Sequence, residues 1–203
     1  MEGTAAIGIW GSLEHADMAA TLAINSLHSP ASDWIWQTFS DKEIWYPLYL
    51  LVLIFLFVRL GWKKALIVTL SCVLTIVICD QLANFTKEFF DRLRPCWDDR
   101  MLSAGLHEIG GKSEYYKYGF YSAHAANAFG FAICSWLGFR NDTRLLWRGY
   151  GWAICIWGFL VGLSRIFAGQ HFLGDVVVGL LVGTLAGWAM AALARLAIRR
   201  LRL

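Results

Sequence analysis

Charged residues are scarce in this sequence. Asp, Glu, Lys and Arg make up 16% of its 203 residues, against roughly 25% in a soluble globular domain. Hydrophobic residues make up 58%. This composition excludes a chain made of several soluble domains. The length predicts a single domain over 1–203. The net charge is only +3, which gives no sign of nucleic acid binding.

The sequence also lacks a cysteine framework. Cys96 alone lies in a polar stretch, and the other four cysteines lie in apolar runs, where cysteine acts as a small hydrophobe. The odd total and the scattered spacing exclude a disulfide scaffold and a zinc site built on cysteine. The first dozen residues contain no Lys or Arg, so we expect no cleaved signal peptide.

Long apolar runs are what the sequence does have. A transmembrane helix needs about 20 mainly apolar residues, and the 11 tryptophans suit a chain with two membrane–water interfaces. The fold class predicted is all-α, an integral-membrane helical bundle of about five spans over 45–203. The expected spans are 45–58, 65–79 with a polar extension to Lys87, 121–139, 149–163 and 176–194.

The N-terminal segment, 1–44, is mixed in composition. Residues 16–27 predict a helix with Met18, Leu22 and Leu27 on one side, and Ser29-Pro30 interrupts it before 33–39 resumes. Neither piece is long enough to span, and paired tryptophans beside acidic residues favour a helix lying in the interface. A further membrane span is the alternative.

The placement of basic residues predicts an orientation. The loops at 59–64 and 140–148 and the segment after 195 hold mostly Lys and Arg, which favours the cytoplasmic side. The loop at 88–118 and the short 165–171 turn then lie on the outer face. The N-terminus is expected outside and the C-terminus in the cytoplasm.

Glycines recur at intervals of four in the last two spans. Gly158 and Gly162 form one pair, and Gly179, Gly183 and Gly187 form a triple. Small residues at this spacing let helix backbones approach closely. We expect these faces to pack against neighbouring helices.

Three polar clusters fall at the outer ends of the predicted spans. Charged residues are costly at membrane depth, which makes each cluster a candidate functional site. Lys87 and Arg94 are seven apart and would share one face if the helix continued, although Pro95 favours its ending there. The second cluster is 121–124, and the third is 164–175.

Together the clusters offer three cations and two histidines. Lys87, Arg94 and Arg165 suit a phosphate group, whose oxygens arginine matches bidentately. His171 and Asp175 are four apart, so on a helix the carboxylate would orient the ring and leave its other nitrogen free to attack phosphorus.

His124 has no acid at a matching offset and is the candidate general acid. Ser122 could donate its hydroxyl to a phosphate oxygen, and the amide of Ala123, at a helix N-terminus, could add dipole stabilisation. No cofactor is expected at this site.

Other interpretations compete with these. Asp80 and Asn84 lie one and two turns before Lys87, and either hold its side chain or form a helix–helix hydrogen bond. His171 and Asp175 could both ligate a metal, but nearby cations would repel it. The histidines that show no partner pattern are expected at the surface; they are His15, His28 and His107.

At these residues the sequence resembles the type 2 phosphatidic acid phosphatase family, integral-membrane lipid phosphatases related to vanadium haloperoxidases. The family motif Lys-x6-Arg-Pro is present at Lys87, Arg94 and Pro95. The motif Ser-Arg-x5-His-x3-Asp is also complete, at Ser164, Arg165, His171 and Asp175. The motif Pro-Ser-Gly-His departs, because Tyr121 and Ala123 replace its proline and glycine.

The resemblance implies a phosphohistidine at His171 supported by Asp175, with His124 protonating the leaving group. It also implies a role for Ser164 in support and for the remaining motif residues in holding phosphate: Lys87, Arg94, Ser122, Ala123 and Arg165. The departures at Tyr121 and Ala123 put substrate fit in question more than reaction type.

The expected function is hydrolysis of a lipid phosphate or diphosphate at the outer face of a bacterial inner membrane, without a metal. Undecaprenyl diphosphate, phosphatidylglycerophosphate and phosphatidic acid are the candidate substrates. Alternatives are a lipid A phosphatase, a lipid phosphotransferase, a transporter that binds lipid phosphate without turnover, and a scaffold with a buried polar network. The oligomeric state stays open.

Overall fold

The computed structural model describes residues 2–112, 117–142 and 147–203. The described chain is helical, apart from an isolated bridge between Leu93 and Tyr118. In order, the helices are α1 (Glu2–Asn25), α2 (Pro30–Ser40), the 3₁₀ turn η1 (Glu43–Trp45), α3 (Tyr46–Leu60), α4 (Trp62–Phe90), the 3₁₀ turn η2 (Pro95–Trp97), α5 (Asp99–Ser103), α6 (Ala123–Phe139), α7 (Arg148–Phe167) and α8 (Leu173–Arg200).

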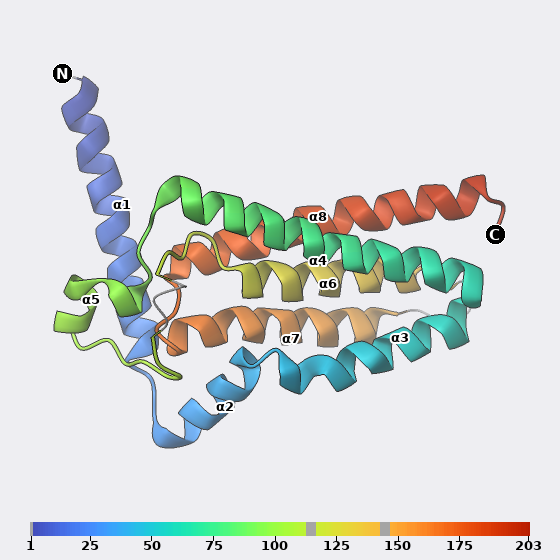
Figure 1. Cartoon of the computed structure of the whole chain (residues 1–203), viewed down its shortest axis with the longest axis horizontal. Helices are drawn as coiled ribbons and strands as arrows, with labels where there is room; N and C mark the ends of the chain where they lie inside the picture. Colours follow the sequence, from blue (N-terminus) through green and yellow to red (C-terminus); the bar gives the residue numbers. More distant parts are fainter. Residues whose placement is uncertain (1, 113–116, 143–146) are drawn as a thin grey trace.

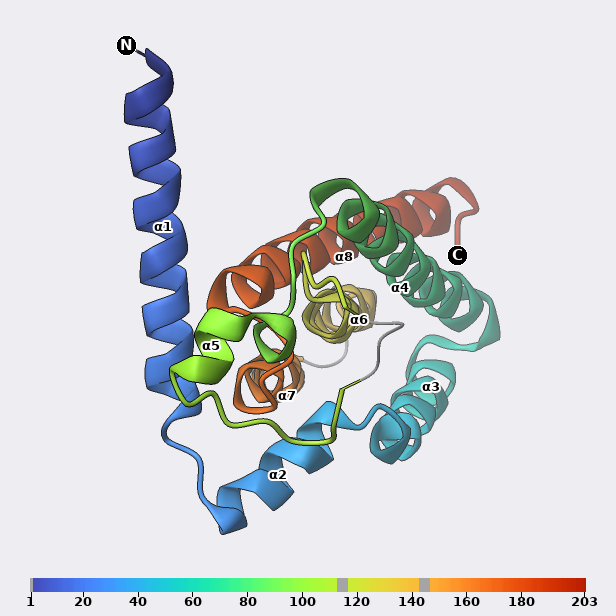
Figure 2. The same ribbon diagram turned by 60° about the vertical axis from the view of Figure 1, so that its left-hand side comes forward.

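Five of these helices form an integral-membrane bundle. Helices α3, α4, α6, α7 and α8 run along one axis, and the other four surround α6 (Figure 1, Figure 2). By length and apolarity α4, α7, α8 and the stretch Glu43–Leu60 can each cross a membrane. Helix α6 has 17 residues and is mostly buried by its neighbours. Each predicted span corresponds to one of these helices, which confirms the fold class.

Glycine brings α6 and α8 into backbone contact. A Cβ atom built on Gly179, Gly183 or Gly187 would lie 2.6, 2.4 and 2.5 Å from carbonyl oxygens of α6 and its N-cap. Real Cβ atoms do not approach so closely, so only glycine fits at these positions. The close packing predicted from the spacing of four is confirmed.

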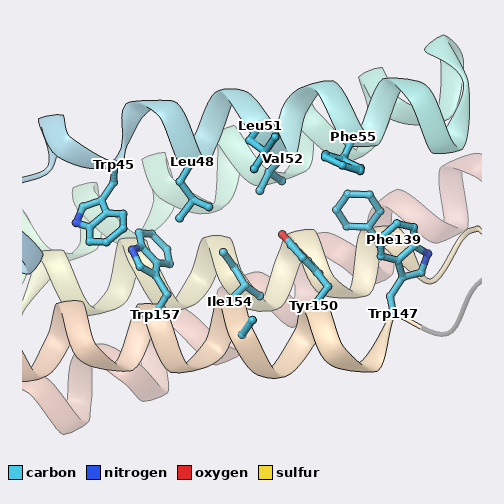
Figure 3. Close-up of a pocket in the computed structure, with 11 residues that line it drawn as sticks. Trp45, Leu48, Leu51, Val52, Phe55, Phe139, Trp147, Tyr150, Ile154 and Trp157 are labelled. Carbon is cyan, nitrogen blue, oxygen red and sulfur yellow. The ribbon is translucent and has the colours of Figure 1, made fainter.

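Helix α3 is held more loosely. Only Val52 and Leu56 of this helix are buried. Between α3 and α7 lies an apolar cavity of about 340 Å³, which Trp45 and Trp157 line at one end and Trp147 at the other (Figure 3). It runs along the bundle axis beside the loosely held helix.

The N-terminal segment differs from its prediction. Helix α1 begins at Glu2, well before the expected residue 16, and runs across the bundle axis (Figure 1). The face it buries is polar, because Thr21 and Asn25 are 0% and 1% exposed while Leu27 is 72% exposed. Leu27 lies beyond the end of α1, so of the predicted apolar side only Met18 and Leu22 belong to the helix, and both are half-buried. Helix α2 begins at Pro30, three residues before the expected start at residue 33, and is capped by Ser29.

The basic segments gather at one end of the bundle. The turn from α3 to α4 and the C-terminus lie together at the end opposite α5 (Figure 1). Arg59 there forms an ion pair of 2.8 Å with Asp142, which joins the ends of α3 and α6. The grouping agrees with the predicted loop alternation. Residues 143–146 and 113–116 of the two predicted loops lie outside the described residues.

Candidate active site

Arg94 reaches the site from a loop. Helix α4 ends at Phe90, and Asp91 takes a left-handed conformation with φ of 46°. The helix does not continue to Arg94, so Arg94 and Lys87 do not share a helix face, in agreement with the expected end of the helix before Pro95. The Arg94 side chain is fixed instead by two hydrogen bonds that it donates, from Nε to the Tyr118 carbonyl at 3.1 Å and from Nη1 to Gln170 Oε1 at 3.0 Å.

His171 and Asp175 meet at the start of α8. His171 precedes the helix, so the predicted helical spacing of four is not how they meet. Asp175 Oδ2 accepts the Phe172 amide at 3.1 Å and lies 3.5 Å from His171 Nδ1. Both side chains are buried, at 2% and 0% exposure. The carboxylate therefore faces Nδ1, and Nε2 is the nitrogen left for chemistry.

The His171 ring is surrounded by positive charge. Burial lowers the pKa of His171 well below its ordinary value, and the charges of Arg94 and Arg165 lower it further. Gly119 brings Arg94 close, since a Cβ atom on it would lie 2.8 Å from Arg94 Cγ and 3.5 Å from His171 Nδ1. The imidazole is therefore neutral at pH 7, the state in which it can act as a nucleophile.

His124 lies in the first turn of α6 and enters the same cluster. The fixed charges that act on it most strongly are those of Arg165 and Arg94. Ser122, fully buried, is the N-cap of α6, and its Oγ accepts the Ala125 amide at 3.4 Å. Because Oγ is an acceptor there, its own proton is still available to a phosphate oxygen. Ala123 begins the helix and packs beside a small apolar cluster.

The remaining cations come from α4 and α7. Lys87 is half-buried in the last turn of α4, and its charge couples to Arg94 and Arg165. Arg165 donates from Nη1 to Ser40 Oγ at the end of α2, while its buried Nε has no partner among the described residues. Lys87, Arg94 and Arg165 are thus brought together as the sequence predicts.

The three residues predicted to support the site behave differently. The Ser164 hydroxyl donates to the Val161 carbonyl at 2.8 Å, so it satisfies its own helix. The charge of Asp80 acts on Lys87, but among the residues that the structure describes no hydrogen bond or ion pair joins the two side chains. Asn84 is exposed on α4 and makes no side-chain hydrogen bond within the described ranges.

Arg92 is a site residue that the motifs missed. Its Nη1 donates to Asp175 Oδ1 at 2.6 Å, its Nη2 donates to Asp17 Oδ2 at 2.6 Å, and its guanidinium lies 4.2 Å from the centre of the Phe172 ring. Asp175 therefore has Oδ1 bound by Arg92 and Oδ2 bound by the Phe172 amide. His171 Nδ1 lies 3.5 Å from Oδ2 and makes no hydrogen bond among the described residues. The clamp fixes the carboxylate that orients the histidine.

Helix α1 completes the site through one polar stripe. Asp17 Oδ1 accepts the Gly174 amide at 2.7 Å, and Thr21 Oγ1 accepts the Leu173 amide at 2.9 Å, so both cap α8. Asn25 donates to the Ile166 and Phe167 carbonyls at the end of α7, at 3.0 and 3.1 Å. The spacing Asp17, Thr21, Asn25 places all three on one helix face and was the available signal.

One other polar group stands outside this site. In the described part of the chain, His28, Asp33 and His107 are the one set of three side chains with ligand atoms close enough to share an ion. His107 Nε2 lies 2.9 Å from Asp33 Oδ2, and its ring stacks on His28. His28 is exposed as expected, and His107 is 27% exposed, but both have partners for which the sequence showed no pattern.

Two histidines among three fixed cations, at the end of a membrane bundle, can bind a phosphate and transfer it. The fold and site thus define an integral-membrane phosphatase. The profile of the PAP2 superfamily matches residues 64–199, and the chain belongs to that superfamily. It is a membrane lipid phosphatase.

Named relatives agree with this membership. A "Lipid A 4'-phosphatase" of Bacteroides thetaiotaomicron is 32% identical over 191 residues, which cover 94% of this chain and 82% of the relative. A "Lipid A 4'-phosphatase" of Porphyromonas gingivalis is 33% identical over 167 residues, 82% of this chain and 67% of the relative.

Solved structures share the fold. The PAP2-type phosphatidylglycerolphosphate phosphatase from Bacillus subtilis superimposes with a TM-score of 0.69 at 19% identity, covering 91% of this chain and 87% of the other. LpxE from Aquifex aeolicus gives a TM-score of 0.61 at 24% identity, with 85% and 92% covered.

Proposed function

We propose that this enzyme hydrolyses a phosphate monoester of lipid A through a phosphohistidine intermediate. The observation that carries the chemistry is the buried His171, 3.5 Å from Asp175 and close to the charges of three cations. The names of the two relatives above 30% identity favour lipid A as the substrate and its 4′-phosphate as the group removed. This choice takes up the lipid A alternative in place of the three candidate substrates named from the sequence, which were undecaprenyl diphosphate, phosphatidylglycerophosphate and phosphatidic acid.

The reaction has two steps. The lone pair on His171 Nε2 attacks phosphorus, the bond from phosphorus to the lipid oxygen breaks, and His124 gives that oxygen a proton. Water then attacks the phosphohistidine, His124 takes its proton, and inorganic phosphate leaves as the N–P bond breaks. Asp175 keeps His171 Nδ1 protonated and stabilises the positive ring between the steps.

The cations hold the phosphoryl group during both steps. Arg94 is oriented by its hydrogen bonds to Tyr118 and Gln170, and the buried Nε–H of Arg165 is available to donate to a phosphate oxygen. The Ser122 hydroxyl and the first amides of α6 complete the phosphate site. Charge that is preorganised in a dry site stabilises the transition state without rearrangement, so no metal is needed.

The lipid body enters from the side. An acyl chain would lie in the apolar cavity between α3 and α7. Beyond the cavity's end at Trp45, packed rings continue through Phe39 and Trp36 to Phe167, near Arg165. We place the site at the outer face of a bacterial inner membrane, with the basic ends of the bundle in the cytoplasm. Helix α1 lies flat in the outer interface, and the five helices of the bundle are spans.

Phosphate release from a panel of lipids in detergent tests the proposal. Lipid A should be the best substrate, ahead of undecaprenyl diphosphate, phosphatidylglycerophosphate and phosphatidic acid. His171→Ala should abolish turnover, and His124→Ala should lower kcat about 10²- to 10⁴-fold, with the smallest loss for substrates with good leaving groups. Vanadate, which mimics five-coordinate phosphorus, should inhibit.

The rival functions give different results. Transfer without free phosphate when a second lipid is present would indicate a phosphotransferase. Lipid binding without turnover by the native chain would indicate a transporter. Activity that survives His171→Ala would refute the phosphohistidine mechanism.

A further inference from the structure

The His28, Asp33 and His107 cluster lies outside the catalytic machinery and joins two separate parts of the outer face. His28 follows α1, Asp33 lies in the first turn of α2, and His107 lies in the loop after α5. One ligand atom from each lies within 4.8 Å of the others. No step of the phosphatase reaction uses these residues.

Asp33 is the unusual member. Its Oδ2 lies 2.9 Å from His107 Nε2, but its Oδ1 is buried and has no partner among the described residues. A buried carboxylate oxygen without a partner is costly. A cation beside it would satisfy the oxygen and balance its charge.

We propose that His28, Asp33 and His107 bind a divalent transition metal ion of the zinc class. Two imidazole nitrogens and one carboxylate oxygen suit zinc, whereas Mg²⁺ and Ca²⁺ prefer sites made of oxygen alone. Water completes the fourth position.

The cluster needs only a local movement to bind. Ligands about 2.0–2.2 Å from a tetrahedral zinc lie roughly 3.4 Å apart. Asp33 and His107 are already closer than that. The His28 and His107 rings lie parallel with centroids 3.6 Å apart, so one ring must turn for both to aim a nitrogen at one ion. His28 is exposed and free to turn.

The bound ion would hold the α1–α2 corner against the loop around residue 107. That loop already contacts the chain before the nucleophile, since the Ile109 amide donates to the Ala168 carbonyl at 3.3 Å. It also contacts the end of α1, where Asn25 donates to the His107 carbonyl at 2.9 Å. The ion is therefore a structural clamp on the outer face beside the active site.

Zinc titration of the purified chain tests the proposal. The protein should carry a tag without histidine, be treated with chelator and desalted, and then receive Zn²⁺ alone, followed by calorimetry and metal analysis. We expect one ion per chain, and a rise in Tm of about 5 °C at roughly a hundredfold excess over Kd. Mg²⁺ should have no such effect.

Matched variants locate the site. His28→Ala and Asp33→Asn should each weaken zinc binding at least about tenfold, because each loses one ligand, while His15→Ala, an exposed histidine elsewhere on α1, should bind normally. The inactive His171→Ala should also bind normally, so the result is independent of the proposed reaction. Absence of binding at 100 µM Zn²⁺, about 10⁻⁴ M, or normal binding by His28→Ala, would overturn the proposal.

Discussion

Arg92 offers the sharpest test of how the active site is held. Its guanidinium bridges Asp17 and Asp175 at 2.6 Å each, and Asp175 is fully buried. Removing one partner of a buried pair costs about 3–5 kcal/mol. Arg92 is itself 27% exposed, which brings our expectation for Arg92→Ala down to about 2–3 kcal/mol of unfolding free energy.

The loss should reach the chemistry as well as the fold. Asp175 would lose the contact that sets its orientation and would hold His171 less well. If half of this loss of about 2–3 kcal/mol also raises the activation free energy, kcat should fall about tenfold. If nearly all of it does, kcat should fall about a hundredfold. KM should change little, because Arg92 does not face the phosphate. Arg92→Lys should fall between, because an ammonium keeps the positive charge but lacks the planar fork whose two nitrogens each bond one carboxylate.

Arg100 provides the matched control. It also binds a carboxylate of α1, Glu14, together with Asp98, but its side chain is 56% exposed and it does not contact the catalytic pair. Arg100→Ala should cost less than about 1 kcal/mol and leave kcat unchanged. The assay is lipid phosphate release in detergent at a temperature where all variants are folded. Equal kcat for Arg92→Ala and the native enzyme would refute the positioning role.

Three further predictions follow from packing, charge and topology. Gly183→Ala should lower the unfolding free energy by about 1–3 kcal/mol, because its Cβ would lie 2.4 Å from the Ala126 carbonyl oxygen. Gly149→Ala, whose Cβ would lie in open space, should leave the unfolding free energy unchanged. Equal Tm values for the two variants would contradict the close backbone packing of α6 against α8. Because burial lowers the pKa of His171 in the folded state, the imidazole is protonated at a higher pH in the unfolded chain than in the folded one. Tm should therefore fall as the pH drops below about 6.5, and it should fall less in His171→Asn. Identical dependence of Tm on pH in the two proteins would count against a neutral buried ring. A thiol at Lys112→Cys should be labelled from outside intact cells, and a protected thiol would invert the topology.

Much of the bundle could be predicted because membrane helices follow from local composition. The span limits were close, and the motif residues met as expected because each lies at a span end on one side. Local pattern failed where the chain leaves the helix: Arg94 and His171 both lie in connections, whose course depends on tertiary contacts.

The role of α1 could not be predicted from apolar periodicity. Its buried face carries Asp17, Thr21 and Asn25, which satisfy amides and carbonyls at the ends of α7 and α8 about 140–157 positions away in the chain. Apolar residues are expected to face inward, so a buried polar stripe is misread as the exposed side. Arg92 was missed for a related reason, because its partners come from both α1 and α8.

The glycine contacts between α6 and α8 divide the molecule into a fixed part and an adjustable part. Backbone against backbone leaves no side chain to compress, so His124 on one helix and Asp175 on the other keep their separation whatever lipid is bound. Substitutions that adapt the enzyme to a new lipid are therefore expected in α3 and around the cavity beside it. There they would change the fit of the acyl chains and leave the reaction unchanged. Reaction type and substrate choice can then evolve independently in this enzyme.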